Sequence, residues 1–341
     1  MKHTIPIRQA VGHVLAHDVT RIVPGREKGA AFRKGHIIQE HDVEELLDMG
    51  KAHIYVLELS PEQVHEDAAA GRIAAAAAGP GLKLSQPREG RVNLIAEYPG
   101  LLKVDVPALN RLNSIQNITF ATLHGNHRVA AGQPVAGTRV VPLIVSEREV
   151  AEAEKTCRSN PPLIAVRPFQ ALRVGMITTG SEVYLGRIKD QFGPVVRKKF
   201  ETLGSRIIRQ IYVSDDVDKT VDAIQTLLAE GARMVVLTGG MSVDPDDRTA
   251  AGIRAAGARV ITYGAPTYPG AMFMLAYMGD VPVLGLPGCV MYHETSIFDL
   301  IVPRLLAGER ITREDIVVLG HGGYCAECAQ CRYPLCGFGK A

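Results

Sequence analysis

Short apolar runs alternate with helically spaced apolar positions from residue 171 to about residue 310. The runs are rich in β-branched residues, which is typical of buried strands, whereas apolar positions three and four residues apart are typical of amphipathic helices. The pattern predicts strands at 173–179, 206–213, 235–238, 260–263 and 281–286, and helices at 192–203, 220–228, 249–256 and 296–306. Such alternation predicts an α/β fold, with a parallel or mixed sheet flanked by helices on both faces.

The pattern before residue 165 is more mixed. Between residues 90 and 145, short apolar runs separated by Gly, Pro and Asn are typical of a small β-rich module. Helices are predicted at 6–17, 42–49, 61–80 and 146–157, and strands at 54–59, 92–96, 101–106 and 140–145. Prolines interrupt the chain near residue 165. We therefore expect an N-terminal mixed and β-rich region at 1–165, an α/β domain at 166–310 and a cysteine-rich tail at 311–341.

Composition narrows the class of protein. The chain has 341 residues and 46% of them are hydrophobic, so it can hold two or three domains with a sizeable core. A net charge of +2 and an aromatic content of 5% argue against a nucleic-acid binder. No apolar run is long enough to span a membrane, and residues 1–6 lack the apolar core of a signal peptide. We expect a cytoplasmic protein with reduced thiols that binds neither nucleic acid nor membrane.

Three of the predicted strands end in glycine-containing turns. In an open parallel sheet, ligands lie beyond the carboxyl ends of the strands, and glycine lets a ligand approach the backbone closely. Backbone N–H groups in such turns favour an anion such as a phosphate. The candidate ligand-binding residues at this edge are Thr179, Gly180, Ser181, Glu182, Thr238, Gly239, Gly240, Ser242, Pro287 and Gly288. The alternative for Gly239-Gly240 is a surface turn that only reverses the chain.

Aspartates follow two of the predicted strands. Asp244, Asp246 and Asp247 come after the glycine pair, and Asp216 follows the strand at 206–213. Carboxylate oxygens are the ligands that Mg²⁺ prefers, so Asp216 and Asp247 are candidates for holding Mg²⁺ against a diphosphate and assisting its cleavage. Asp247 has a second interpretation, because an aspartate that precedes a helix can simply cap it.

Four cysteines lie close together near the end of the chain. Cys325, Cys328, Cys331 and Cys336 are separated by two, two and four residues. In a reducing compartment such a cluster indicates a metal site rather than disulfides. The spacing suits a tetrahedral zinc site or a [4Fe–4S] cluster, with His321 as an alternative ligand. The sequence leaves zinc and iron–sulfur equally open.

Residues 173–310 resemble the molybdopterin-binding domain shared by molybdopterin molybdotransferases (MoeA), gephyrin-type proteins and the CinA group. The matching segments come in family order: Thr178–Val183, Val213–Asp216, Thr238–Val243 with Asp247, Tyr268–Gly270 and Leu286–Gly288. Residues 10–19 resemble the opening of the molybdotransferases more weakly. Four positions depart from the family pattern, since Ser181 replaces an acidic residue, Ala271 replaces a lysine, and Cys289 and Val290 replace Asn-Pro.

The resemblance implies a molybdopterin-binding protein in molybdenum cofactor biosynthesis or handling, with molybdopterin or its adenylylated form as ligand. If the protein is an enzyme, the resemblance implies a transferase that cleaves adenylylated molybdopterin and attaches molybdate with Mg²⁺. A non-catalytic carrier or sensor that docks on a molybdoenzyme is a second hypothesis, and a CinA-like nucleotide pyrophosphatase is a third. The departures at Ser181, Ala271 and Cys289 favour binding without metal insertion. The resemblance also implies a homodimer.

Overall fold

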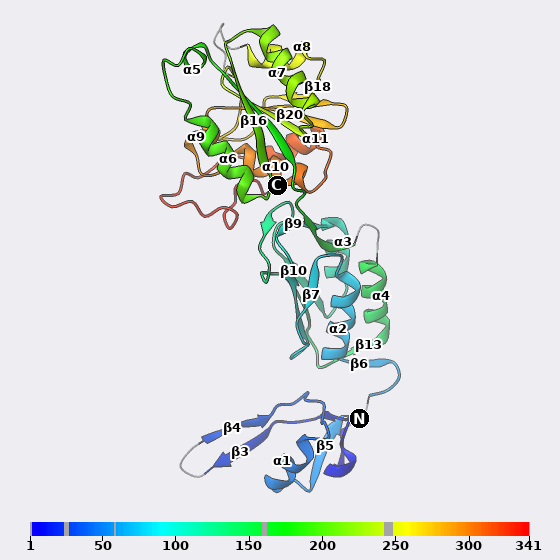
Figure 1. Cartoon of the computed structure of the whole chain (residues 1–341). Helices are drawn as coiled ribbons and strands as arrows, with labels where there is room; N and C mark the ends of the chain where they lie inside the picture. Colours follow the sequence, from blue (N-terminus) through cyan, green and yellow to red (C-terminus); the bar gives the residue numbers. More distant parts are fainter. Residues whose placement is uncertain (1, 24–26, 58, 159–161, 242–247, 341) are drawn as a thin grey trace. The chain divides into compact units, whose positions relative to one another are not determined.

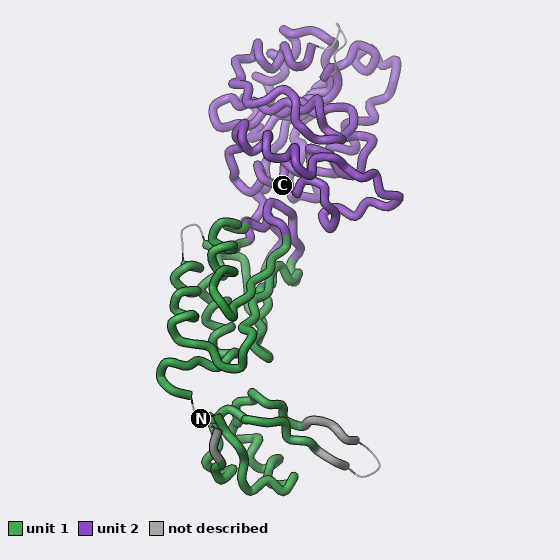
Figure 2. Tube along the Cα trace, turned by 180° about the vertical axis from the view of Figure 1, so that it is seen from behind, with its two compact units in different colours: residues 1–97, 104–123, 131–165 green, residues 98–103, 124–130, 166–341 purple. Residues whose placement is uncertain are grey.

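The computed structural model describes the chain except for residues 1, 24–26, 58, 159–161, 242–247 and 341. The chain forms two compact units (Figure 2). The first contains residues 1–97, 104–123 and 131–165, and the second contains residues 98–103, 124–130 and 166–341. None of the described helices is both long and apolar enough to cross a membrane.

The first unit begins with a small β-rich part. Strands β1 (Lys2–Pro6), β5 (His53–Leu57) and β2 (Val14–Leu15) form an antiparallel sheet in that order. Strands β3 (Val19–Val23) and β4 (Glu27–Phe32) form a hairpin, and α1 spans Asp42–Asp48. The predicted helix at 6–17 is wrong: the segment holds only a 3-10 turn at Ile7–Gln9 followed by β2. Gly12 has φ +83°, which no α-helix accommodates, and Ala10 and Leu15 are buried in the small core instead.

The rest of the first unit is a four-stranded sheet with helices packed on it. Strands β10 (Ile118–Thr122), β12 (Pro134–Val140), β8 (Arg91–Ala96) and β7 (Leu82–Leu84) pair antiparallel in that order. Helix α2 (Glu66–Ala77) packs on β8, β12 and α4 (Glu147–Cys157), and α3 (Val106–Asn113) packs on α4 and β10. Strands β6 (Gln63–His65) and β13 (Ile144–Ser146) pair beside them. Arg72 of α2 ties the helices together through Glu147 and Glu154 of α4.

A six-stranded mixed sheet organises the second unit (Figure 1). Its order is β16 (Arg206–Val213), β15 (Arg173–Thr179), β17 (Met234–Thr238), β20 (Val281–Leu286), β19 (Met274–Met278) and β18 (Arg259–Tyr263). The first four run parallel, and β19 runs antiparallel to both of its neighbours. The predicted α/β fold with a parallel or mixed sheet is therefore confirmed. A three-stranded sheet in the order β11 (Arg128–Val129), β9 (Gly100–Val104) and β14 (Ile164–Pro168) accompanies it.

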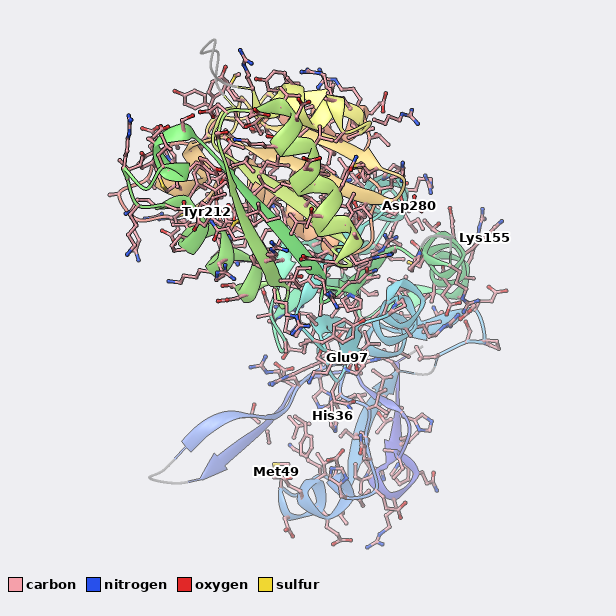
Figure 3. All side chains as sticks on the ribbon, turned by 45° about the horizontal axis from the view of Figure 1, so that its top comes forward. His36, Met49, Glu97, Lys155, Tyr212 and Asp280 are labelled. Carbon is pink, nitrogen blue, oxygen red and sulfur yellow. The ribbon has the colours of Figure 1, made fainter. Side chains whose placement is uncertain are left out.

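Helices cover both faces of the large sheet, and side chains alternate between the two resulting cores. On β17, Met234 and Val236 face α6 (Phe192–Thr202) and α10 (Ile297–Leu306), whereas Val235 and Leu237 face α7 (Val217–Ala229) and α8 (Thr249–Ala255). The four inner strands β15, β17, β20 and β19 are buried on both faces, which explains their continuous apolar runs in the sequence. Tyr212 and Asp280 mark exposed positions around this core (Figure 3).

The cysteine-rich segment packs on the α6–α10 side of the sheet. It follows α11 (Arg313–Val317) and a 3-10 turn at Val318–Gly320. Phe338 is 3% exposed and belongs to the same core cluster as Phe298 and Leu300. The N–H of Gly339 donates to the carbonyl of Gly322 (2.9 Å), so the segment forms a loop that is closed at its base. Residues 322–339 are called the cysteine loop below.

Candidate ligand-binding site

A cavity of about 590 Å³ opens beyond the carboxyl ends of β17 and β20. It is called the strand-end cavity below. Four predicted residues line it: Gly239, Gly240, Pro287 and Gly288. The other lining residues are Phe192, Met241, Tyr268, Pro269, Gly270, Ala271, Met272, Leu286 and Cys289. The two glycine turns meet here because β17 and β20 are parallel neighbours, which brings their carboxyl ends to one edge.

The geometry of the chain itself requires the Gly239-Gly240 turn. Gly239 has φ +86°, and a Cβ built on it would lie 2.2 Å from the backbone oxygen of Thr179. Gly240 has φ +53°, and its Cβ would lie 2.6 Å from Oγ1 of Thr249. Side chains with a Cβ rarely adopt such angles, so glycine is needed at both positions whether or not a ligand binds.

Buried threonines hold this turn in place. The Thr179 hydroxyl donates to the Thr238 carbonyl (3.2 Å) and shares a 2.8 Å hydrogen bond with Thr249. The Thr249 hydroxyl donates to the Gly239 carbonyl (2.9 Å), and the Thr249 N–H donates to the Gly240 carbonyl (3.2 Å). Thr179 and Thr238 therefore lie beneath the turn and position it, rather than lining the cavity.

Gly288 differs from the other two glycines. Its backbone is in the right-handed helical region, with φ −53° and ψ −30°, which any residue adopts. A Cβ built on it meets nothing within 4 Å. Neither backbone conformation nor packing within the described chain explains a glycine here. Gly288 is exposed and is one of the residues that line the strand-end cavity.

The rest of the wall is apolar or aromatic. Phe192, Met241, Tyr268 and Met272 contribute large side chains, and none of the described residues that line the cavity is charged. Burial raises the pKa of the Cys289 thiol, so this thiol stays protonated at neutral pH and is a poor nucleophile. Of these wall residues, Phe192, Met241 and Met272 were not predicted from the sequence, whereas Tyr268 lies in a family segment and Cys289 departs from the family pattern. The Tyr268-Pro269-Gly270 turn is the sequence signal for this part of the wall. The structure requires glycine in it, because Gly270 has φ +137° and a Cβ there would collide with Ile297.

The remaining predicted site residues lie elsewhere. Gly180, Ser181 and Glu182 follow β15 at the same edge of the sheet but do not line the cavity. The N–H and hydroxyl of Ser181 both donate to a carboxylate oxygen of Asp215, at 2.8 and 2.9 Å. Asp216 caps α7, since its Oδ1 accepts from the Lys219 N–H (3.0 Å). Ser242 and Asp247 lie outside the described residues.

The four clustered cysteines line a second cavity, of about 620 Å³, which is called the cysteine cavity below. Cys325, Cys328, Cys331 and Cys336 all contribute to its wall, and all are free thiols. They do not form a ready-made ligand set, because the described residues contain no group of three or more His, Cys, Asp or Glu side chains placed to hold a metal ion.

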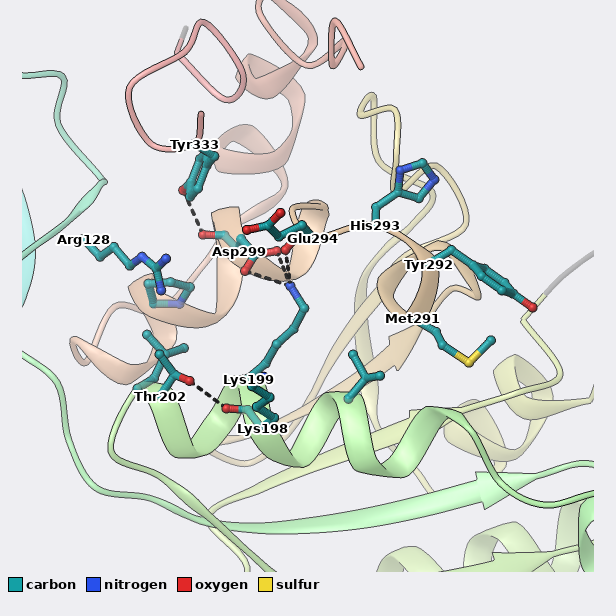
Figure 4. A pocket seen from close by; sticks show the side chains of 13 residues that line it. Arg128, Lys198, Lys199, Thr202, Met291, Tyr292, His293, Glu294, Asp299 and Tyr333 are labelled. Atoms are coloured by element: carbon teal, nitrogen blue, oxygen red, sulfur yellow. Dashed lines mark hydrogen bonds and ion pairs between the residues drawn. The ribbon is translucent and has the colours of Figure 1, made fainter. Parts of the chain in front are cut away.

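A third cavity, of about 430 Å³, lies between α6 and the start of α10 (Figure 4). Lys199 lines it, donates to the Glu294 carbonyl (2.7 Å) and pairs with Asp299 (2.9 Å). The Tyr333 hydroxyl donates to the Asp299 carbonyl at 3.1 Å. These contacts fix the segment before α10 and one point of the cysteine loop.

The α/β part of the second unit is similar to a known protein family. Residues 175–307 match a family described as a probable molybdopterin binding domain. The match to the family confirms the resemblance noted in the sequence. Residues 4–58 match a separate family, described only as a domain of unknown function, rather than the molybdotransferase opening that residues 10–19 resemble.

Individual relatives cover only parts of this chain. A CinA-like protein of Mycobacterium sp. (strain JLS) is 35% identical over 80 residues, which is 23% of this chain and 19% of the relative. The molybdopterin molybdenumtransferase of Synechococcus elongatus is 28% identical over 149 residues, 41% and 37% of the two chains. The chain thus spans well under half the length of either relative. A tungsten cofactor synthesizing protein MoaB from Pyrococcus furiosus aligns with TM-score 0.35 and 22% identity over 41% of this chain and 98% of its own.

Proposed function

We propose that this protein binds molybdopterin in the strand-end cavity and acts in the biosynthesis or handling of the molybdenum cofactor. Gly288 is the observation that carries the proposal. No contact with the described residues requires glycine there, it lines the strand-end cavity, and it lies in the segment that matches the molybdopterin-binding family. A ligand that approaches the backbone at this point supplies the missing reason for glycine.

The character of the wall suits the two ends of this ligand. Molybdopterin has a flat pterin ring system and a phosphate tail. Phe192, Tyr268 and the methionines offer apolar and aromatic surface to a flat ring. The glycine turns offer backbone to the phosphate without obstruction by side chains.

Gly288→Ala tests the proposal because it separates binding from folding. The added methyl group enters open space, so stability should change by less than about 0.5 kcal/mol. Affinity for molybdopterin, measured by anaerobic titration calorimetry, should fall at least tenfold (about 1.4 kcal/mol) because the methyl group occupies ligand space. Gly240 is unsuitable for this purpose, since a substitution there strains the turn itself.

Gly71→Ala is the matched control. Gly71 lies inside α2 in the first unit, where a Cβ would make only an ordinary 3.5 Å contact with Pro87. This change should leave affinity unaltered and raise stability slightly, because alanine favours helix. Unchanged affinity in Gly288→Ala would refute the placement of the ligand.

We propose insertion of molybdate as the catalytic form of this function, with Asp247 and Asp216 as Mg²⁺ ligands. The alignment with a molybdopterin molybdenumtransferase supports it. With adenylylated molybdopterin, molybdate and Mg²⁺, AMP should be released. Asp247→Asn should lower that rate by orders of magnitude, with affinity kept within about tenfold (about 1.4 kcal/mol). Tight binding without AMP release would favour the carrier or sensor, and hydrolysis of ADP-ribose would favour a nucleotide pyrophosphatase.

We also propose that the cysteine loop holds one zinc ion or one [4Fe–4S] cluster. The spacing of the four cysteines and their common cavity support this. Metal analysis of anaerobically purified protein, together with its visible spectrum, distinguishes the two metals. Absence of stoichiometric zinc and iron from protein purified without chelators or oxygen would contradict the proposal.

The partners of the protein follow from the same proposal. A carrier would deliver its cofactor to a molybdoenzyme, and mixing the loaded protein with such an apoenzyme should restore that enzyme's activity. We further propose a homodimer, which light scattering coupled to size-exclusion chromatography tests directly. A monomer mass would contradict it.

A further inference from the structure

Two chain segments lie against both the strand-end cavity and the cysteine cavity. The first is the turn at Tyr268, which lines the strand-end cavity. The Tyr268 N–H donates to the Gly323 carbonyl (2.7 Å), and its carbonyl accepts from the Cys325 N–H (2.8 Å). Tyr268 and Tyr324 therefore pair like residues of neighbouring parallel strands. Backbone hydrogen bonds therefore join the segment that contains Cys325 to Tyr268 in the wall of the strand-end cavity.

The second shared segment runs from the end of β20 to the start of α10. Gly288 and Cys289 line the strand-end cavity. The short helix α9 (Cys289–Tyr292) follows at once, and residues 292–295 line the cysteine cavity. Thr295 Oγ1 lies 3.3 Å from Cys331 Sγ. A displacement of the third cysteine thus acts on a segment whose other end forms the ligand wall.

The base of the cysteine loop is fixed. Phe338 is buried in the core, and Gly339 lies so close to Leu300 that a Cβ would come within 2.2 Å of its side chain. Tyr333 is tied to Asp299 (Figure 4). The four thiols surround their cavity without forming a ready-made ligand set. Binding of one metal by all four therefore requires the loop to contract between fixed points.

We propose that metal binding by the cysteine loop regulates the strand-end cavity through the Tyr268 turn and α9. The contracted loop holds these two wall segments in one arrangement. A ligand that meets an ordered wall loses less conformational freedom on binding, so the metal-loaded form binds more tightly. The identity of the regulated ligand rests on the proposed function, whereas the mechanical link rests on the two shared segments alone.

The test compares full-length reduced protein without metal, with one equivalent of Zn²⁺, and with sulfide plus equal amounts of Fe²⁺ and Fe³⁺, which match the iron oxidation states of a [4Fe–4S] cluster. Hydrogen exchange followed by mass spectrometry needs no pterin. Metal should slow exchange in peptides covering 266–271 and 287–296 at least tenfold, because the Tyr268 turn and α9 are then held in one arrangement. Anaerobic titration should show molybdopterin affinity raised at least tenfold by the same metal.

Two variants make the test specific. Cys328→Ser combined with Cys331→Ser should bind no metal and show no metal-dependent change in either measurement. Cys157→Ala removes a thiol that is buried in α4, far from the loop in sequence, and should keep the full response.

The outcomes separate this inference from the proposed function. Metal binding without a change in exchange or affinity overturns the coupling and leaves the ligand assignment intact. Failure of both metals to bind has the same two consequences. Slowed exchange at 266–271 with no molybdopterin binding in any form supports the coupling and refutes the ligand.

Discussion

Gly239→Ala and Gly257→Ala form a matched pair that isolates the close approach in the ligand turn. Both glycines have φ +86°. A Cβ at Gly257, just after α8, meets nothing within 4 Å, whereas a Cβ at Gly239 would lie 2.2 Å from the Thr179 backbone oxygen. The backbone strain is therefore common to the two variants, and only Gly239→Ala adds a collision.

The expected magnitudes follow from these contacts. An L-residue in the left-handed region costs about 1–2 kcal/mol, which is the whole expected effect for Gly257→Ala. The collision at Gly239 is relieved only if the turn moves away from Thr179. This movement breaks the Thr179–Thr238 and Thr249–Gly239 hydrogen bonds, at about 1 kcal/mol each. Gly239→Ala should therefore lose about 3–4 kcal/mol.

Native-state hydrogen exchange is the suitable assay, because the chain has two units and a single unfolding transition is not assured. The opening free energy of the β15 and β17 amides reports on the second unit alone. Gly239→Ala should lower it by about 2 kcal/mol more than Gly257→Ala does, since the hydrogen bonds are the only difference. Equal losses in the two variants would refute the idea that the turn is pressed against β15.

Three further predictions concern capping, titration and the cysteine loop. Asp216→Ala should cost about 1 kcal/mol by calorimetry and Asp216→Asn almost nothing, because asparagine is an equally good cap; equal losses would contradict the capping role. Burial lowers the pKa of His127 to about 4, so its contribution to stability is complete above pH 6.5 and is lost as pH falls towards 4. The loss should reach about 3 kcal/mol, and in chemical denaturation His127→Gln should show a shallower fall than wild type over that range. Phe338→Ala should destabilise the second unit by about 3 kcal/mol in hydrogen exchange, whereas Leu335→Ala, 76% exposed, should change it by less than 0.5 kcal/mol; similar effects would show that the loop is not part of the fold.

The sequence pattern locates most strands of the second unit because both faces of the sheet are covered. A strand that is buried on both sides appears as an unbroken apolar run, as 173–179 and 281–286 do. Strand β19 was missed for a related reason. Met274–Met278 is apolar but contains no β-branched residue, so its propensity for a strand is weak, and only pairing with β20 and β18 reveals it.

The cysteine loop shows where sequence reasoning failed. The end of the strand–helix alternation near residue 310 predicted a separate cysteine-rich tail at 311–341. The structure instead buries Phe338 against Phe298 and Leu300, which lie in a helix far earlier in the chain. A single aromatic residue among glycines gives no periodicity, so its long-range partner cannot be read from a local pattern.

The glycines of the strand-end cavity look alike in the sequence, yet the structure divides them into two kinds. Gly239, Gly240 and Gly270 have positive φ and close neighbours, so the fold alone accounts for them. Gly288 has an ordinary helical backbone and open space before it, so the fold does not. A search for glycine turns therefore finds the edge of the sheet where a ligand can bind. Only the conformation of each glycine identifies Gly288 as the residue at which binding can be impaired while the fold is left intact. The Gly288→Ala substitution therefore decides the ligand assignment.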